Sequence, residues 1–221
     1  GMPERCDIWR NAHDELIMQS LDTSVIENIK IVSVKYFHEK SESSIELTYS
    51  IYGNGILKVK QTLYPSGVEY PELPRFGMKV SINETFDNLE WFGRGPHESY
   101  WDRKTSAKID RYKGKVIDQT YKYVRPQETG NKTDIRWLAL YNGSIGLMLK
   151  GLPVFDGSVH HYDYALLDYY KGSQLHGKTD ITKGDQIDLI VDHKQMGVGG
   201  DNSWGAKPHP KYTLPMDTTV Y

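Results

Sequence analysis

Ser44-Ile45-Glu46-Leu47-Thr48-Tyr49-Ser50-Ile51 is the stretch that decides the fold, because polar and apolar side chains alternate along it without a break. Gly53-Asn54-Gly55 interrupts the pattern, which resumes at Leu57, Val59 and Leu63. Successive side chains of a strand point to opposite faces, so strict alternation indicates a half-buried strand. The two runs together predict a long hairpin with one buried and one solvated face.

The same alternation continues along the rest of the chain. Further strands are predicted at residues 76–82, 135–141, 145–149, 186–191 and 211–215. Asn142-Gly143 lies between two of these runs and favours a two-residue type I′ turn. One or two helical turns are expected at 11–20 and 165–170. Short strands separated by turn signals predict an all-β fold, a large antiparallel β-sandwich that forms a single domain over residues 1–221.

Composition and charge exclude several classes of protein. The chain has 221 residues and a formal net charge of −2, and it has no basic run of the kind that follows a phosphate backbone, so no nucleic-acid partner is expected. No apolar stretch approaches the roughly 20 residues of a membrane span. Cys6 is the only cysteine, which excludes an internal disulfide and a zinc site built on several cysteines, but does not separate cytoplasm from periplasm. Gly1-Met2 is typical of a cloning scar, and no signal segment follows it.

Three segments expected to be loops, residues 91–103, 125–137 and 196–205, combine glycine with aromatic, acidic, basic and amide side chains. Loops of that chemistry on a rigid scaffold are common binding sites. Their acids are Glu98, Asp102, Glu128 and Asp201. A paired-carboxylate glycosidase site is one interpretation. The favoured interpretation is that these acids brace the loops by pairing with Arg94, Arg103, Arg125 and Arg136.

Asp201-Asn202-Ser203-Trp204 is the segment best suited to contact a ligand. An indole can cover the apolar face of a sugar ring, while carboxylate, amide and hydroxyl groups bind its hydroxyls. The alternative is a tryptophan packed against the edge of the sandwich. His160, His161 and Asp163 suggest a metal site, but the two neighbouring histidines of a strand would point to opposite faces, so no metal is expected there.

Three longer motifs resemble one known family. They are Trp91-Phe92-Gly93-Arg94-Gly95-Pro96 followed by Glu98, Tyr100, Asp102 and Arg103; Arg125-Pro126-Gln127-Glu128 with Gly130-Asn131, Asp134, Arg136 and Trp137; and Met196-Gly197-Val198-Gly199-Gly200-Asp201-Asn202-Ser203-Trp204. In this order they are similar to the C-terminal domain of family-two glycoside hydrolases, the β-galactosidases. Asn202 departs from the family's usual second Asp, and residues 9–15 match the family's domain start only weakly.

The resemblance implies a super-sandwich of the galactose-mutarotase-like type within a larger retaining β-galactosidase. It implies that the catalytic glutamates lie on a (β/α)₈ barrel absent from this chain, and that magnesium and sodium bind in another domain, with no cofactor here. The family's tryptophan at the position of Trp204 forms part of the platform for the incoming sugar. The implied partners are a β-galactoside and the remaining domains of the parent enzyme.

Two alternatives remain open at this point. One is a free-standing carbohydrate-binding module. The other is a sugar-converting enzyme such as an aldose epimerase, which needs an acid and a base that face one pocket. Its candidates are His160, His161, His176 and Glu128.

Overall fold

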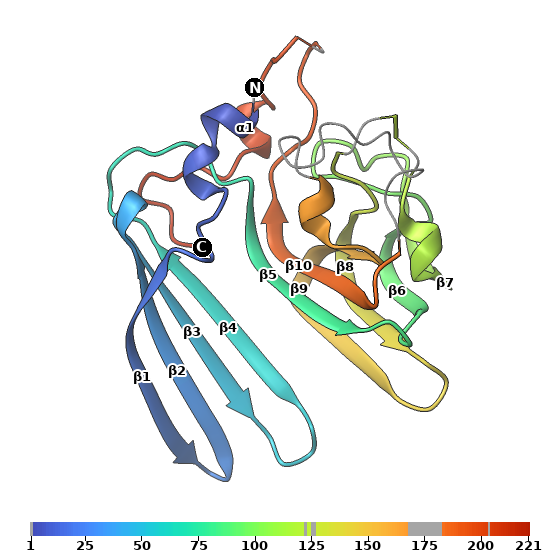
Figure 1. The fold of residues 1–221 in the computed structure, drawn as a ribbon, viewed down its shortest axis with the longest axis horizontal. Helices are drawn as coiled ribbons and strands as arrows, with labels where there is room; N and C mark the ends of the chain where they lie inside the picture. Colours follow the sequence, from blue (N-terminus) through green and yellow to red (C-terminus); the bar gives the residue numbers. More distant parts are fainter. Residues whose placement is uncertain (1, 122, 125–126, 168–182, 203) are drawn as a thin grey trace. The chain divides into compact units, whose positions relative to one another are not determined.

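The computed structural model describes residues 2–121, 123–124, 127–167, 183–202 and 204–221. The predicted all-β fold is confirmed: the strands form two antiparallel sheets, one of four strands and one of six. The chain divides into two compact units, Gly1–Pro74 with Leu214–Tyr221, and Arg75–Thr213. Each unit contains one of the sheets (Figure 1).

The first unit contains a four-stranded meander with strand order β1-β2-β3-β4. The strands are β1 (Leu16–Ile26), β2 (Ile29–His38), β3 (Ser43–Ile51) and β4 (Leu57–Tyr64), drawn from blue to cyan in Figure 1. Short helical turns, α1 (Met2–Arg5), η1 (Asp7–Trp9) and η2 (Glu39–Ser41), precede the sheet or connect its strands. The predicted hairpin is confirmed, since Ile45 pairs with Leu63 and Ile51 pairs with Leu57.

The β1–β2 hairpin corrects one prediction. Helix was expected over residues 11–20, but from Leu16 onward the chain is strand. Glu27 (φ 48°) and Asn28 (φ 66°) are both left-handed, as the two central residues of a type I′ turn require. Pairing with β2 along almost the whole of β1 supplies the backbone hydrogen bonds, so tertiary pairing overrides a weak helical pattern.

The second unit contains a six-stranded sheet with strand order β5-β10-β9-β8-β6-β7. Its strands are β5 (Arg75–Asn83), β6 (Asn88–Gly95), β7 (Lys108–Lys115), β8 (Lys132–Tyr141), β9 (Gly146–His160) and β10 (Gln186–Gln195). Short 3₁₀ turns, η3 (Val116–Gln119), η4 (Tyr164–Leu167) and η6 (Pro210–Tyr212), lie between or after them. The strands predicted at 76–82, 135–141 and 186–191 are confirmed.

Three local predictions for residues 91–215 are wrong. Residues 91–95 were expected in a loop but belong to β6, where all of them pair with β7 and Trp91 and Phe92 also pair with β8. Residues 211–215 do not form a strand, because Pro210 opens a 3₁₀ turn there. The β8–β9 connection spans four residues, and Asn142 is not left-handed, so it is not a two-residue type I′ turn. Instead, the Asn142 side chain accepts hydrogen bonds from the amides of Ser144 and Ile145.

Opposite faces of the six-stranded sheet differ in chemistry. One face builds the hydrophobic core, which includes Leu89, Trp91, Ile135, Leu140, Ile187 and Leu189, each at most 2% exposed. The other face carries buried polar side chains, among them Asp156 and His160 on β9 and Asp188 and Asp192 on β10. Loops of the second unit that carry the sequence motifs supply further buried polar groups.

Candidate functional site

The candidate site is the segment of residues 196–209 that follows β10, here called the Trp204 loop. Hydrogen bonds from two backbone amides fix its first turn. The Gly197 amide donates to the Tyr212 carbonyl, and the Gly199 amide donates to Asp102 Oδ2, each at 2.8 Å. A Cβ at position 197 would lie 2.6 Å from that same carboxylate oxygen, so only glycine permits the close approach. The first and third sequence motifs therefore meet here.

Trp204 projects from this loop. Its side chain is 92% exposed, so the indole is not packed against the edge of a sheet. The Asn202 side chain accepts a hydrogen bond from the Trp204 amide at 2.8 Å, an Asx turn that fixes the backbone just before the indole. Asp201 pairs with His209 Nε2 at 2.8 Å, which ties the middle of the loop to its last residue. Ser203, the fourth residue of the predicted segment, lies outside the described residues.

Two packed aromatic rings lie near the start of the loop. The Trp101 and Tyr212 rings meet edge to face with centroids 6.0 Å apart. Lys194 Nζ lies 5.1 Å from the centroid of the Trp101 ring, within cation–π range. Sequence reasoning missed this aromatic pair, although Trp101 lies next to Asp102 in the first motif.

The motif carboxylates brace loops, as the favoured interpretation predicted, but several partners differ. Glu98 is 6% exposed and accepts hydrogen bonds from Arg103 (2.5 Å), from the Gly130 amide (2.8 Å) and from the Tyr123 hydroxyl. Glu128 pairs with Arg75, which lies outside the three motifs.

Arg94 pairs with Asp134 at 2.5 Å, and Lys104 pairs with the same carboxylate. These two cations lower the pKa of Asp134 against the opposing effect of burial, which is the larger single influence. The backbone of Asp134 is left-handed (φ 54°), a conformation that a non-glycine residue seldom adopts. The two ion pairs hold the side chain of this residue in place within β8. Arg125, expected to take part in the bracing, lies outside the described residues.

A lysine is buried beside Glu98. Lys132 is 3% exposed, and its ammonium donates to the Gly130 carbonyl at 3.0 Å and lies 5.3 Å from the Trp91 ring centroid. Burial lowers its pKa to about 8, with the Glu98 charge opposing that shift. The Glu98 carboxylate therefore favours the protonated form of this buried lysine.

Two aspartates face each other across β9 and β10. Asp156 and Asp192 are register partners, and each is 1% exposed. Burial raises the pKa of Asp192 to about 7, with Arg75 opposing the shift and the Glu128 and Asp156 charges adding to it. Burial also raises the pKa of Asp156 to about 6. Among the described residues, no group of three or more histidine, cysteine or acidic side chains is placed to hold a metal ion.

Two of the residues considered for an aldose epimerase, His160 and Glu128, share Arg75 and Tyr162 as neighbours. His160 is fully buried against the Tyr162 hydroxyl at 2.9 Å, and burial lowers its pKa to about 3. His161 pairs with Asp87 at 2.8 Å, and Glu128 pairs with Arg75. His176 lies outside the described residues.

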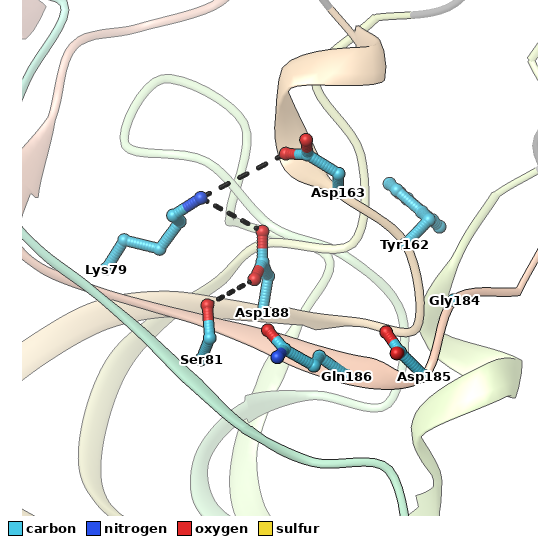
Figure 2. A pocket seen from close by; sticks show the side chains of 8 residues that line it. All are labelled: Lys79, Ser81, Tyr162, Asp163, Gly184, Asp185, Gln186 and Asp188. Atoms are coloured by element: carbon cyan, nitrogen blue, oxygen red, sulfur yellow. Dashed lines mark hydrogen bonds and ion pairs between the residues drawn. The ribbon is translucent and has the colours of Figure 1, made fainter.

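A pocket of about 250 Å³ lies beside β5 and β10 (Figure 2). Its lining residues are Lys79, Ser81, Tyr162, Asp163, Gly184, Asp185, Gln186 and Asp188. Figure 2 shows Lys79 and Ser81 pointing toward Asp188, which pairs with Lys79 at 3.3 Å and accepts a hydrogen bond from Ser81 at 2.9 Å. Of the epimerase candidates that the structure describes, His160, His161 and Glu128, none is among these lining residues. In the part of the chain that the structure describes, no helix has the length and apolar character needed to cross a membrane.

The fold and the braced loop define an all-β domain that presents one exposed tryptophan. Residues 2–221 match the sequence model of the beta galactosidase small chain family, and the chain belongs to that family. It is 42% identical over 212 residues to a β-galactosidase of Priestia megaterium, an alignment that covers 96% of this chain and 20% of that protein. β-Galactosidases of Vibrio cholerae and Halalkalibacterium halodurans are 31% and 30% identical, over 90% and 86% of this chain. The chain spans about a fifth of the length of these relatives.

Proposed function

We propose that this chain completes the sugar-binding site of a β-galactosidase-like hydrolase whose catalytic groups lie outside it. The observation that carries the proposal is the 92% exposed Trp204 on a loop fixed at several points. An indole held ready by its backbone loses little entropy on binding, and its face fits the C–H face of a sugar. Asp201 and Asn202 stand beside it to bind hydroxyl groups, and Ser203 completes the predicted set.

The motif acids support a division of labour between this chain and the rest of the parent enzyme. A retaining glycosidase needs two carboxyl groups flanking the scissile bond. Here Glu98 and Glu128 are paired with arginines, and Asp102 holds the Trp204 loop. In this proposal the catalytic glutamates and the magnesium and sodium ions belong to other domains. The galactose-mutarotase-like assignment of the fold is part of the same proposal.

A complementation assay tests the function. The matched fifth of the Priestia megaterium β-galactosidase is deleted, and this chain is added to the remainder with a chromogenic β-galactoside. We expect restored hydrolysis, with Trp204→Ala raising KM about tenfold, in line with roughly 1.4 kcal/mol of lost ring contact. Trp204→Phe should recover part of the loss.

Val124→Ala is the control, since it shortens another highly exposed apolar side chain (80%) of the same unit. Restored hydrolysis with the same KM for Trp204→Ala and the control would contradict the role of Trp204. Hydrolysis by the isolated chain would contradict the division of labour.

The exposed indole equally favours a carbohydrate-binding module as the second candidate. Calorimetry of the isolated chain with galactose and lactose separates the two. Heat of binding that disappears in Trp204→Ala favours the module, whereas binding only in the complemented enzyme favours the divided site. Mutarotation at the uncatalysed rate would dismiss the epimerase alternative.

A further inference from the structure

The pocket of Figure 2 has no role in the function proposed above. Three stretches of chain build it: Lys79 and Ser81 on β5, residues 162–163 just after β9, and residues 184–188 at the start of β10. All of its lining residues belong to the second unit, so the pocket is defined within that unit alone. Its volume of about 250 Å³ lies just below the roughly 300–1,000 Å³ of sites for drug-sized ligands, which suits a single small ring.

The charged groups of the pocket are held in place by one another. Asp188 is 6% exposed and accepts hydrogen bonds from Ser81 at 2.9 Å and from Lys79 at 3.3 Å. The Lys79 ammonium also lies 4.0 Å from Asp163, whose carboxylate accepts a hydrogen bond from the Ala165 amide. Side chains that are already ordered lose little entropy when a ligand binds.

Two short loops form the rim of the pocket, one after β9 and one before β10. The Gly184 amide donates to the His161 carbonyl at 2.6 Å, which joins the two loops. Beside them, the Tyr162 hydroxyl is hydrogen-bonded to His160 Nδ1 at 2.9 Å, and the two rings lie 4.8 Å apart. Since its hydroxyl is already engaged, Tyr162 contributes an apolar ring to the pocket wall.

The charges of the pocket argue against three classes of ligand. Its lining has three aspartates, Asp163, Asp185 and Asp188, against the single lysine Lys79, so an anion such as a phosphate would be repelled. An organic amine would meet the Lys79 ammonium, which already lies between two of the carboxylates. A metal ion is not favoured either, because among the described residues no group of three or more acidic, histidine or cysteine side chains is placed to hold one. A neutral polar ligand fits best.

We propose that this pocket binds a single neutral sugar ring through adjacent hydroxyl groups. A hydroxyl group both donates and accepts hydrogen bonds, so one hydroxyl can accept from the Lys79 ammonium and donate to the Asp163 carboxylate. Its neighbour on the ring can donate to Asp185 and accept from the Gln186 amide, and Figure 2 shows these two side chains among those that line the pocket. The C–H face of the same ring fits against Tyr162.

The pocket is separate from the Trp204 loop. Asp188 lies near the start of β10, and Met196 follows its end. Eight residues of strand span roughly 26 Å. One sugar ring cannot contact both places, so this site goes beyond the proposed function and can fail independently of it.

A titration of the nitrogen-15-labelled chain with methyl β-D-galactoside, followed by NMR, tests the proposal. Unlike a total heat of binding, residue-resolved shifts separate the pocket from Trp204. We expect the backbone amides of residues 184–186 to shift and saturate with a dissociation constant on the order of millimolar, since a ligand this small makes few contacts. Trp204→Ala should leave these shifts unchanged. Galactose 6-phosphate should bind at least about tenfold more weakly, because the acidic lining repels it.

Two variants remove groups that the proposal uses. Lys79→Met and Asp185→Ala should each weaken binding at least about fivefold, as expected when a hydrogen bond to a charged group is lost. Asp185 is exposed, so its variant keeps the test valid even if Lys79→Met lowers stability by taking the lysine from Asp188. The matched control, Asp118→Ala, removes an exposed aspartate of the same unit outside the pocket and should change binding by less than about twofold.

Several outcomes would overturn the proposal. These are the lack of a saturable shift at residues 184–186, equal affinity of the wild type and Asp185→Ala, and equal binding of galactose 6-phosphate. A response of these amides to calcium chloride but not to the galactoside would make the pocket a cation site instead. Shifts confined to Trp204 would remove this second site while supporting the proposed function. Shifts at residues 184–186 that disappear in Trp204→Ala would show that they report on the Trp204 loop.

Discussion

The two sheets carry the same alternating pattern but use it differently. In the six-stranded sheet, β10 buries Ile187 and Leu189 completely in a continuous core. In the four-stranded sheet, β1 leaves Leu21 and Val25 more than half exposed. Alternation therefore defines which face of a strand is apolar, whereas how far that face is buried depends on what packs against it.

Their charged groups differ in the same way. The second unit buries Glu98 in a loop and Lys132, Asp156 and Asp192 on strands β8, β9 and β10. The first unit has pairs such as Lys35 with Glu46, register partners with side chains 60% and 39% exposed. Buried ionic groups are costly to disrupt, while exposed pairs contribute little. The contrast predicts large effects in one unit and small ones in the other.

The largest effect should come from the core of the six-stranded sheet. Ile187→Ala removes three carbons from a fully buried site and should lower the free energy of unfolding by about 3 kcal/mol. Val25→Ala, at an exposed position, should change it by less than about 0.5 kcal/mol. Urea unfolding of the isolated chain measures both. Equal losses of unfolding free energy in the two variants would contradict the difference in burial between the two sheets.

A second, smaller effect should come from the buried glutamate. Glu98→Gln turns an acceptor into an amide that faces three donors, those of Arg103, Tyr123 and Gly130. We expect a loss of roughly 2 kcal/mol, below the usual figure for fully buried pairs because Arg103 is half exposed. The control, Glu46→Gln, removes one member of the exposed pair with Lys35 and should leave the unfolding midpoint unchanged. A comparable loss in the control would contradict the contrast.

The smallest effect is a pH dependence. Since the pKa of Asp192 is about 7 in the folded chain and near 3.8 when unfolded, the folded state holds the extra proton between these values. Its contribution to stability is complete below about pH 4 and is lost as the pH rises toward 7. Relative to Asp192→Asn, the wild type should therefore lose more than about 1 kcal/mol between pH 4.5 and 7.

The comparison with the variant removes the opposing contribution of His160. The pKa of His160 is lowered to about 3, so this residue makes stability rise with pH up to about 6.5. His160 is present in both proteins and cancels in the difference. A difference that grows with rising pH would contradict the assignment to Asp192.

Local pattern was sufficient for much of this fold. The hairpin of residues 45–63 and the strands at 76–82, 135–141 and 186–191 follow from alternation alone. The β1–β2 hairpin was missed because its turn, Glu27-Asn28, lacks glycine, and because β1 is held by pairing with β2 rather than by its own pattern. The Asn142 loop was misassigned because its side chain satisfies two backbone amides locally, which permits a longer connection.

The sequence by itself determined that this chain is all-β, which face of each strand is apolar, and which segments combine glycine with aromatic and charged side chains. These are properties of neighbouring residues, and spacing along the chain reveals them. Only the tertiary structure decided that Trp204 is exposed, that Asp102 holds Gly199 from 97 positions away, and that Glu128 pairs with Arg75. Burial and pairing depend on which distant segments meet, and no local pattern encodes that meeting.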